Sequence, residues 1–502
     1  MKDRVRIQLT PLGVSFEVER GTPLQDSLFG YGVEFPCGGR ARCRGCRVKV
    51  IEGSLPVSPE EEKILGPSEL SAGWRLACRC RAEGDLTLEI AQWETMILAD
   101  SSEFQFTPGE GLGITVDLGT TTLVGQLLDM KTGHVLAVEM ALNAQARHGS
   151  DVMSRVQFAV AKGGHKTLEG IIRREIGTMV RRLLDAAKVD ASGLHDIVLV
   201  GNTVMHHIFC GIDLEPLSHF PFEPVRHGLE VFTPAELGWE IGGSPRVRFL
   251  PCLGSFVGSD ILGGILATEL HLSDELKALV DLGTNGEIVI GNKERLLCTS
   301  TAAGPAFEGA RISMGMRAST GAIARVSVVD GKLDCHVLGN VEPRGICGSG
   351  LVDAVAAGLD LGLIRPNGRF ADGRGAWELC PPVAINQTDV RELQLAKGAI
   401  AAGFRILLDH WGATREDLRR VYLAGAFGNY ISRSSARRIG LLQFPEEKVR
   451  PSGNTALLGA KIALFNARGG VEEFEPILRK TEHLCLSADE KFQDTYIEEM
   501  TF

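Results

Sequence analysis

One pattern occurs twice in this chain and limits the folds that it can adopt. The segments "LGITVDLGTTTLVGQLLD" at 112–129 and "ALVDLGTNGEIVIGN" at 278–292 each contain an apolar strand, an Asp-Leu-Gly-Thr turn and a second apolar strand. Each copy is followed by another apolar strand that runs into a glycine and then a helix, at 196–209 and 421–431. A single copy is weak evidence, because the same residues also form ordinary hairpin turns. Two copies in the same order predict two similar α/β halves that face each other across a cleft.

The residues of the two turns suit a nucleoside triphosphate. An aspartate at the end of a strand offers a carboxylate to Mg²⁺ or water, and a Gly-Thr turn offers N–H and hydroxyl donors to phosphate oxygens. We therefore expect Asp117 and Asp281 to be catalytic, because they would position Mg²⁺ or water. The residues expected to contact the nucleotide are Thr120, Thr121, Thr122, Gly283, Thr284, Asn285, Gly286, Glu287, Gly348, Ser349, Gly350, Gly425, Ala426, Phe427 and Gly428.

Two glycine-containing segments support the prediction of nucleotide contacts to different degrees. The glycines of "AGAFG" at 424–428 would let a nucleoside lie close against the backbone. The turn "ICGSGL" at 346–351 fits either an approach to the nucleotide or a plain junction between a loop and a helix.

The N-terminal region concentrates cysteines. "CGGRARCRGC" at 37–46 contains three, and "GWRLACRC" supplies Cys78 and Cys80. Four thiolates can enclose a cationic centre, and the loop glycines let backbone N–H groups turn toward the sulfur atoms. Zinc sites usually pair two C-x2-C knuckles, whereas this spacing resembles that of the 2Fe-2S ferredoxins. We expect Cys37, Cys43, Cys46 and Cys78 to bind a 2Fe-2S cluster, with zinc and buried free thiols as alternatives. Cys80 is the alternative fourth ligand, although "RLAC" resembles the ferredoxin ending and favours Cys78.

Basic residues surround these cysteines in the sequence. Three interpretations are open: a docking patch for an acidic partner, counter-charges that favour the reduced cluster, and solvated charges without a specific partner. The residues concerned are Arg40, Arg42, Arg44, Arg47, Lys49, Arg79 and Arg81.

The remaining N-terminal residues have the pattern of a small α+β domain. Alternation over 4–19 about a Pro-Leu-Gly turn predicts a β-hairpin, and "RVKVIEG" at 47–53 predicts a further strand. A helix is predicted with Thr22 as its N-cap and Pro23 at its first position. The polar segment "ADSSEFQFTPGEGLG" that follows has no sustained period and predicts a linker. The expected divisions are a ferredoxin-like domain at 1–95, the linker at 96–112, a first ATPase-like lobe at 113–275 and a second at 276–502.

Length and charge exclude several classes of function. The 502 residues suffice for about three domains. A formal charge of −10 argues against nucleic acid or an anionic membrane as the main partner. No secretory signal or membrane-length apolar run is evident, so a cytoplasmic location is expected. Twelve cysteines in so long a chain do not make a disulfide scaffold.

The two modules together resemble a known family. The duplicated turns resemble the actin, sugar kinase and Hsp70 ATPase superfamily. Longer strings, including "LNAQARHGSDVMSRV", "GNTVMHHIFCGID", "TSTAAGPAFEGARISMGMRA" and "LAKGAIAAGFRILL", resemble the reductive activators of corrinoid enzymes over nearly the whole chain. The resemblance implies an N-terminal β-grasp ferredoxin-like domain followed by a two-lobed ATPase domain. Longer members carry a further small domain after the ferredoxin, whereas only a short linker is available here.

The resemblance also implies an activity. One electron would pass from the 2Fe-2S cluster to a Co(II) corrinoid and regenerate Co(I), with ATP and Mg²⁺ in the cleft. The implied partners are the corrinoid protein of a methyltransferase system and a low-potential electron donor, and a homodimer is compatible with it. Alternatives are a small-molecule kinase, an ATP-driven chaperone that reactivates a cobalamin enzyme, and an activator of a radical dehydratase.

Other chemically interesting residues have simpler explanations. The adjacent pair His206 and His207 lies in an apolar stretch without metal-ligand spacing and is expected to be structural. The seven cysteines beyond Cys80 are scattered and are expected to be buried small side chains.

Overall fold

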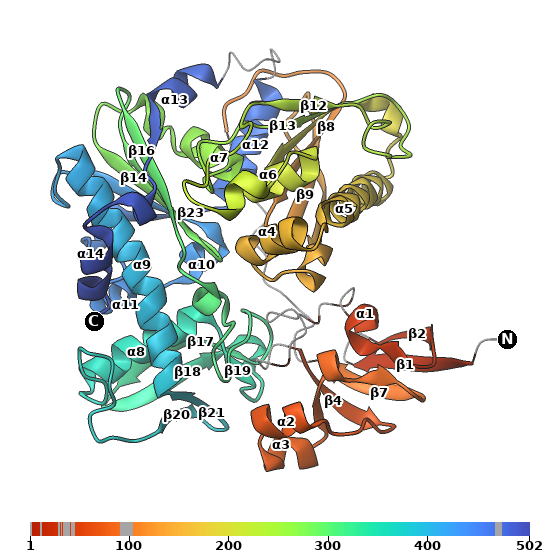
Figure 1. The fold of residues 1–502 in the computed structure, drawn as a ribbon, viewed down its shortest axis with the longest axis vertical. Coiled ribbons are helices and arrows are strands. Elements are labelled where there is room, and N and C mark those ends of the chain that lie inside the picture. Colours follow the sequence, from red (N-terminus) through yellow and green to blue (C-terminus); the bar gives the residue numbers. More distant parts are fainter. Residues whose placement is uncertain are drawn as a thin grey trace.

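A computed structural model describes residues 3–10, 13–28, 31, 33, 41, 46–90, 104–466 and 474–502 (Figure 1). The predictions on Cys37, Cys43, Arg40, Arg42 and Arg44 lie outside the described residues.

The N-terminal domain is a β-grasp fold. Its five-stranded sheet has the order β2-β1-β7-β4-β5, in which β1 and β7 are parallel and the other neighbours are antiparallel. The predicted hairpin and the strand that starts at Arg47 are both present. The bounds are β1 Arg4–Thr10, β2 Val14–Glu19, α1 Leu24–Leu28, β4 Arg47–Glu52, α2 Pro59–Ile64, α3 Pro67–Ser71, β5 Trp74–Leu76 and β7 Leu86–Ile90.

The prediction that a helix begins at Pro23 was wrong. Thr22 and Pro23 form a short strand, β3, which pairs with β6 (Arg81–Ala82), and the helix begins at Leu24. The Leu24 N–H donates to the Cys80 carbonyl at 3.0 Å, so pairing with a distant strand takes the place of an N-cap. The local sequence contains no sign of that pairing.

Two six-stranded sheets form the larger unit, and they repeat one topology. The first has the order β10-β9-β8-β11-β13-β12 and the second β23-β22-β14-β15-β16-β24. In each, an antiparallel meander of three strands is extended by two parallel strands, and one further strand is added at an edge. The predicted duplication of the actin, sugar kinase and Hsp70 type is therefore confirmed. The sheet that contains β8 is here called the first lobe, and the sheet that contains β14, with its attached elements, the second lobe.

The strands of these sheets have the following bounds. The first lobe contains β8 Leu112–Leu118, β9 Thr122–Asp129, β10 Val135–Leu142, β11 Leu194–Val200, β12 Glu230–Phe232 and β13 Arg246–Phe249. The second contains β14 Lys277–Leu282, β15 Gly286–Gly291, β16 Leu296–Thr301, β22 Arg420–Ala424, β23 Val449–Gly453 and β24 Thr481–His483.

Two helices, α7 (Ser259–Thr268) and α12 (Thr455–Phe465), pack between the two sheets. Their apolar side chains share one core with Val198 of the first sheet and Val289 of the second. The helices cross at glycines: a Cβ on Gly459 would lie 2.1 Å from the Gly263 carbonyl oxygen. The C-terminal half of the chain thus supplies a helix that covers the sheet of the first lobe.

Further helices cover the outer faces of the sheets. The first lobe carries α4 Val152–Ala161, α5 His165–Ala187 and α6 Thr203–Cys210, and the second carries α9 Gln387–Trp411, on which α14 Phe492–Glu499 packs. Helix α13 Glu475–Lys480 instead joins the core between the sheets, to which it contributes Ile477. A smaller layer below the second sheet contains β17 Ala322–Val329, β18 Lys332–Val337, β19 Gly345–Ile346, α8 Gly348–Asp360, β20 Ala376–Cys380, β21 Val383–Asn386, α10 Gly425–Tyr430 and α11 Arg433–Arg438.

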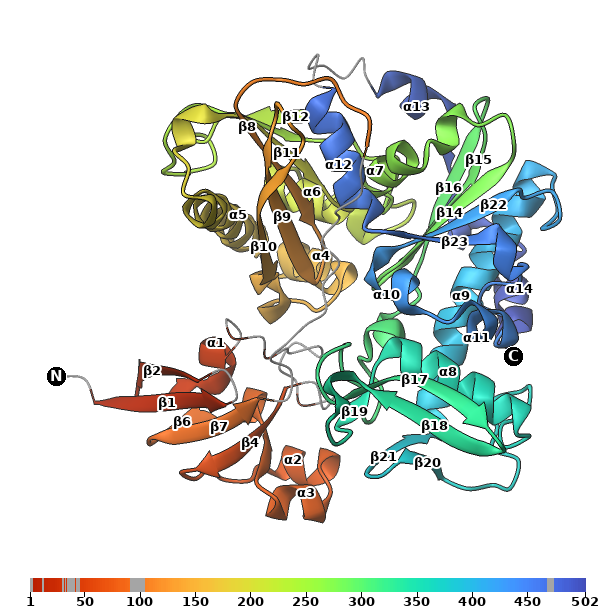
Figure 2. The same cartoon turned by 180° about the vertical axis from the view of Figure 1, so that it is seen from behind.

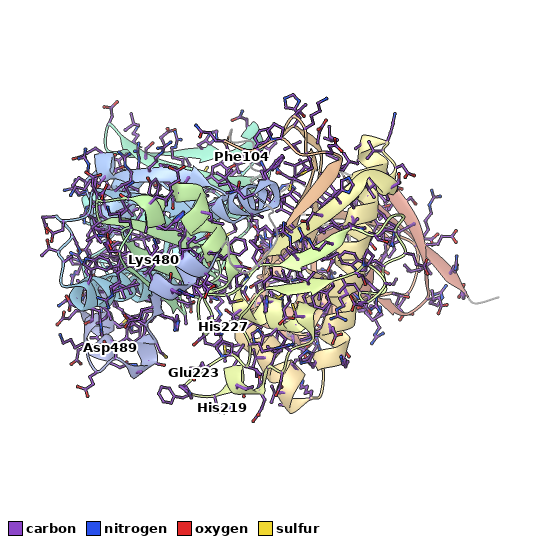
Figure 3. All side chains as sticks on the ribbon, turned by 90° about the horizontal axis from the view of Figure 1, so that it is seen from above. Phe104, His219, Glu223, His227, Lys480 and Asp489 are labelled. Carbon is purple, nitrogen blue, oxygen red and sulfur yellow. The ribbon has the colours of Figure 1, made fainter. Side chains whose placement is uncertain are left out.

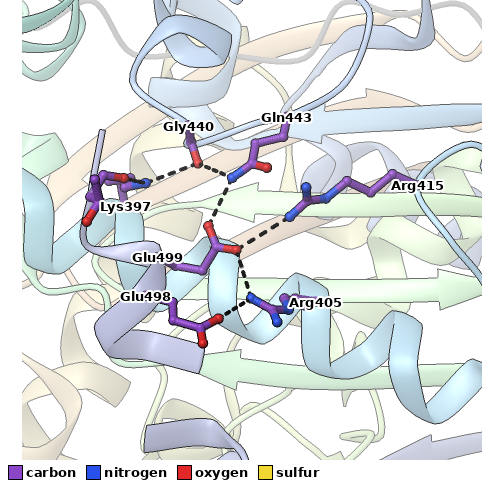
Figure 4. Close-up of polar contacts among 8 residues, drawn as sticks. Lys397, Arg405, Arg415, Gly440, Gln443, Glu498 and Glu499 are labelled. Atoms are coloured by element: carbon purple, nitrogen blue, oxygen red, sulfur yellow. Dashed lines mark hydrogen bonds and ion pairs between the residues drawn. The ribbon is translucent and has the colours of Figure 1, made fainter. Parts of the chain in front are cut away.

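Side-chain contacts hold two segments against the larger unit: the described part of the predicted linker and the C-terminal residues. In the described part of the predicted linker, Phe104 and Phe106 pack against Phe465 of α12, with ring centroids 5.3 Å and 4.6 Å away (Figure 3). At the C-terminus, the Lys397 ammonium donates to the Thr501 carbonyl at 2.7 Å, and Glu499 accepts contacts from Arg405, Arg415 and Gln443 (Figure 4).

Candidate functional site

The two predicted turns line one cavity between the lobes. Asp117 lies near the end of β8 and Asp281 near the end of β14, and both carboxylates border a cavity of about 280 Å³. Predicted residues in its lining are Asp117, Thr120, Thr121, Thr122, Asp281, Gly283, Thr284, Asn285, Glu287, Gly348, Ser349, Gly425 and Phe427.

Three of the predicted glycines pack against neighbouring atoms. A Cβ on Gly286 would meet Ile400 at 2.7 Å, one on Gly350 the Ile323 carbonyl at 2.1 Å, and one on Gly428 the Leu423 side chain at 3.0 Å. Ala426 lies in α10, beside Gly425. These glycines permit close packing of the elements behind the cavity.

The cavity holds a group of carboxylates with raised pKa values. Burial raises the pKa of Asp117 to about 6, and burial with repulsion from Asp117 raises that of Asp281 to about 7. Burial, together with the charges of Asp281 and Asp117, raises the pKa of Asp260 to about 8. The pKa of Glu287 is also raised, mainly by burial and further by the charge of Asp260. Such a group gains stability from a cation or from protons.

Several residues that line this cavity were missed from the sequence, and four of them bear on the predicted turns or their carboxylates. Asp260 stands in the first turn of α7, and Asn454 caps α12 and donates to the Asp117 carboxylate at 3.0 Å. Asn202 caps α6 and donates to the Thr120 hydroxyl at 2.9 Å. Glu308 accepts the Thr284 hydroxyl at 2.7 Å. For Asp260, Asn454 and Asn202, the available signal was their position at the start of a helix. Residues of these types are also ordinary helix caps, so the signal was not specific.

The two turns touch each other across the cavity. The hydroxyl oxygens of Thr121 and Thr284 are 3.3 Å apart. Donors from both lobes are therefore held at one point, where phosphate oxygens of a single ligand could accept from both.

Equivalent glycines hold the two turns in equivalent ways. A Cβ on Gly201, after β11, would lie 2.7 Å from the Leu118 carbonyl oxygen, and one on Gly425, after β22, 2.8 Å from that of Leu282. Gly425 also has a φ of +83°, and its Cβ would lie 2.6 Å from the Asp281 carboxylate. Glycine is required there by both conformation and space. Beside it, Phe427 stacks on Phe307, with centroids 4.6 Å apart.

Within the described residues, no three His, Cys, Asp or Glu side chains are grouped closely enough to hold a metal ion by themselves. Mg²⁺ commonly keeps several waters and uses one or two carboxylates plus substrate phosphates. The donor set of the cavity fits that mode of binding, in which the nucleotide completes the site.

Two of the predicted cluster ligands lie on one edge of the N-terminal sheet. Cys46 precedes β4 and Cys78 follows β5, and the Ala77 N–H donates to the Cys46 carbonyl at 2.9 Å. Cys78 is half-buried, whereas Cys80 is buried and its sulfur lies 3.8 Å from the Glu61 carboxylate. Cys46 is buried as well, so burial alone does not separate it from Cys80. What distinguishes Cys80 is the Glu61 carboxylate beside it. Burial, together with that carboxylate, raises the pKa of the Cys80 thiol and disfavours the thiolate that a cluster requires.

Two of the basic residues near these cysteines are paired with acids. Arg47 is buried, forms an ion pair with Glu69 at 3.1 Å and lies over the Trp74 ring. Arg79 pairs with Glu60 at 2.9 Å. Arg47 is therefore excluded from an exposed docking patch, although its sequence neighbours contain no acid.

His206 and His207 are fully buried, and burial lowers their pKa values to about 3 and about 4. His207 contacts the Thr203 carbonyl at 2.8 Å, as expected for a structural pair.

In the described part of the chain, no helix is both long and apolar enough to cross a membrane.

Family models cover the chain in three parts. Residues 7–83 match the 2Fe-2S iron-sulfur cluster binding domain, residues 112–273 the RACo middle region, and residues 275–502 the C-terminal domain of RACo, the ASKHA domain.

Individual proteins are similar over most of the chain. The corrinoid activation enzyme RamQ of Eubacterium limosum is 35% identical over 77% of this chain and 69% of its own length. The Co(II) methylated amine-specific corrinoid protein reductase of Methanosarcina barkeri is 28% identical over 78% of this chain and 77% of its own. A solved structure, "Reductive activator for corrinoid,iron-sulfur protein", has a TM-score of 0.71 and 28% identity, and covers 99% of this chain and 98% of its own.

Proposed function

The chain belongs to the family of reductive activators of corrinoid proteins, and we propose how its own residues perform that activity. The activity is ATP-dependent: one electron passes from a 2Fe-2S cluster to the Co(II) corrinoid of a partner protein and regenerates Co(I). One observation carries the proposal for this chain, namely a cysteine edge suited to a cluster in the same polypeptide as a two-sided cleft suited to a triphosphate.

The 2Fe-2S cluster supplies a one-electron carrier, and we assign its ligands to Cys37, Cys43, Cys46 and Cys78. The adjacency of Cys46 and Cys78 on the sheet edge supports two of them. Cys37 and Cys43 rest on the sequence spacing. The Glu61 carboxylate beside the Cys80 sulfur, which disfavours a thiolate there, supports its assignment to the core.

In the cleft, we assign Asp117 and Asp281 to Mg²⁺ and to the water that attacks the terminal phosphate. Burial raises the pKa values of both, and repulsion from Asp117 adds to that of Asp281, so a divalent cation would stabilise both carboxylates in the ionised form. Asp260 borders the same cavity and adds a third carboxyl group that can orient water. The phosphates would lie between Thr121 and Thr284, where hydroxyls of both lobes meet.

The nucleoside is assigned to the end of the cavity that contains Gly425 and Phe427. Gly425 lines this part of the cavity, and the stacked pair Phe427 and Phe307 provides an apolar surface. Gly348 and Ser349 border the cavity at the start of α8.

ATP is required because the electron moves uphill. Plant-type clusters have potentials near about −400 mV, and each ~59 mV by which an acceptor lies lower makes a one-electron transfer tenfold less favourable. ATP in the cleft could change the affinity for particular states of the corrinoid protein, which is what coupling requires. We propose that the partner belongs to a methyltransferase system and that a low-potential donor reduces the cluster.

The test mixes the reduced protein with candidate Co(II) corrinoid proteins, with and without Mg²⁺ and ATP, and follows the absorption of Co(I). Co(I) should form only with ATP, and Cys43→Ser should abolish its formation. A Cys43→Ser variant that still reactivates the partner would contradict the proposal and favour an ATP-driven chaperone.

A further inference from the structure

One segment of the first lobe has two functional faces. Residues 142–147, "LNAQAR", begin at the last residue of β10, and their side chains alternate in environment. Leu142, Ala144 and Ala146 pack against the apolar core of the N-terminal domain. Asn143 and Gln145 are fully buried and point the other way. Asn143 contacts the turn at 119–121, here called the phosphate turn, and Gln145 contacts the Arg155 guanidinium. This segment is part of the string "LNAQARHGSDVMSRV", which the proposed function does not explain.

The polar face holds three successive carbonyls of the phosphate turn. The Asn143 backbone N–H donates to the Thr121 carbonyl at 2.9 Å, and its amide side chain donates to the Gly119 carbonyl at 3.0 Å. The Thr120 carbonyl accepts from the Arg155 guanidinium, which also contacts the Gln145 amide oxygen at 3.1 Å. Because Asn143, Gln145 and Arg155 are all fully buried, these bonds are shielded from water. The turn and the segment therefore move as one unit.

The N-terminal domain also contacts the second lobe (Figure 2). Glu89 of β7 forms an ion pair with Arg344 at 3.0 Å, and Arg47 donates to the Arg344 carbonyl at 3.2 Å. On the first lobe, Arg147 donates to the Asp26 carbonyl at 3.4 Å. The small domain thus bridges the lobes on either side of the nucleotide cleft.

We propose that the docked N-terminal domain and a nucleoside triphosphate compete, so that nucleotide binding releases the domain from the second lobe. The proposal rests on the proposed function, because it requires that the cleft takes ATP. A phosphate oxygen that enters between the Thr121 and Thr284 hydroxyls, at about 2.7–2.8 Å from each, separates them beyond their present 3.3 Å. That change shifts the phosphate turn, and with it residues 142–147, relative to Arg344. A rigid domain cannot keep both contacts when its two supports move apart. Asn143 and Arg155 are the positioning residues of this link.

The first measurement uses hydrogen–deuterium exchange in the unmodified full-length protein. A non-hydrolysable ATP analogue with Mg²⁺ should increase exchange around Arg344, whereas the amides of β7 should stay protected by pairing with β1 and β4. Unchanged exchange in the presence of bound analogue would overturn the competition. Failure of the analogue to bind at all would instead contradict the proposed ATP site, so the two failures are distinguishable.

The second measurement uses affinity, since coupling is reciprocal. Arg344→Glu places like charges at the bridge and should tighten binding of the analogue about fivefold or more. Adding Glu89→Arg restores an ion pair and should restore the original dissociation constant. Arg374→Glu is the matched control, because Arg374 pairs locally with Asp372. Equal or weaker binding by Arg344→Glu would overturn the proposal.

A double-mutant cycle tests the positioning role of Asn143. In an Asn143→Ala background the turn loses its side-chain link, and Arg344→Glu should no longer tighten analogue binding. The same tightening in both backgrounds would show that coupling does not pass through Asn143. A merely structural role of Asn143 would change affinity without changing this difference.

Discussion

The hydroxyl oxygens of Thr121 and Thr284 lie 3.3 Å apart, although the residues are separated by 163 positions in the chain. Thr284 donates its proton to Glu308 at 2.7 Å. A hydroxyl has only one proton, so Thr121 donates to Thr284 in this arrangement. The two halves of the cleft are therefore joined by a directed chain of hydrogen bonds that a bound triphosphate would redirect.

Replacement of Thr284 tests this relationship. Thr284→Val keeps the volume but removes the hydroxyl, and should weaken binding of a Mg²⁺–ATP analogue about tenfold, the effect of one hydrogen bond to a charged group. Thr284→Ser should bind normally. Thr178→Val, on the surface of α5, is the control. Titration of each variant gives the dissociation constants, and equal values for Val and Thr would contradict the assignment.

Loss of either turn aspartate should abolish hydrolysis. Asp117→Asn or Asp281→Asn should lower the rate of Mg²⁺-dependent ATP hydrolysis about 100-fold or more, because each removes a charge that acts on Mg²⁺ or water. The visible spectrum of the cluster should be unchanged, since the cysteines lie in another domain. The exposed Asp274, paired with Lys293, provides a control in Asp274→Asn. Hydrolysis that survives in both turn variants would refute a two-sided site.

The cleft carboxyl groups predict a pH dependence of stability. The pKa values of Asp281 and Asp260 are raised from 3.8 to about 7 and about 8, so above pH 6.5 the folded protein binds more protons than the unfolded chain. Stability should therefore fall as pH rises from 6.5 to 8. The pKa values of buried His206 and His207 are lowered from 6.5 to about 3 and about 4, so their contribution to stability rises as the unfolded chain loses these protons near pH 6.5. This opposite effect is nearly complete by about pH 7.5, and the difference between the parent protein and Asp260→Asn isolates the carboxyl effect.

The measurement is the melting temperature of the nucleotide-free protein, which should drop by a few degrees between pH 6.5 and 8. Asp260→Asn should reduce the drop, and Mg²⁺ with an ATP analogue should nearly remove it. A melting temperature that rises over this range would show that the carboxylates are ionised without cost.

The two neighbouring cysteines should differ in their effect on the cluster. The anaerobically purified protein and Cys80→Ser should hold two irons and two sulfides per chain, the content of a 2Fe-2S cluster. Cys78→Ser should lose most of this iron. Iron and sulfide analysis of both variants decides the matter: retention in Cys78→Ser with loss in Cys80→Ser would reverse the assignment.

Much of the fold follows from local patterns. The Asp-Leu-Gly-Thr turns between apolar runs indicated both hairpins, and the glycines after β11 and β22 marked the equivalent crossings. These signals are strong because each depends on residues close in the sequence. The equivalent close approaches of Gly201 and Gly425 show that the duplication extends to atomic contacts.

Other features depend on partners far away in the chain. Asp260 is an ordinary first-turn residue until folding brings it beside Asp281, and only then does its environment become unusual. Thr22 and Pro23 have the composition of a helix start but pair with residues near position 81. Arg47 has no acidic neighbour in sequence and pairs with Glu69 in space. Sequence periodicity contains no information on such contacts.

The placement of α12 affects the order in which the molecule can form during synthesis. The first sheet is complete once residue 249 has left the ribosome, but α12, which covers its inner face, ends at residue 465. At roughly 5–20 residues per second, that face waits on the order of ten seconds or longer for its cover. Leu128, Val198 and Val200 would be exposed to other nascent chains during this interval. A fragment that stops after the first lobe would stay in that condition permanently, so we expect it to aggregate or to bind chaperones when expressed alone.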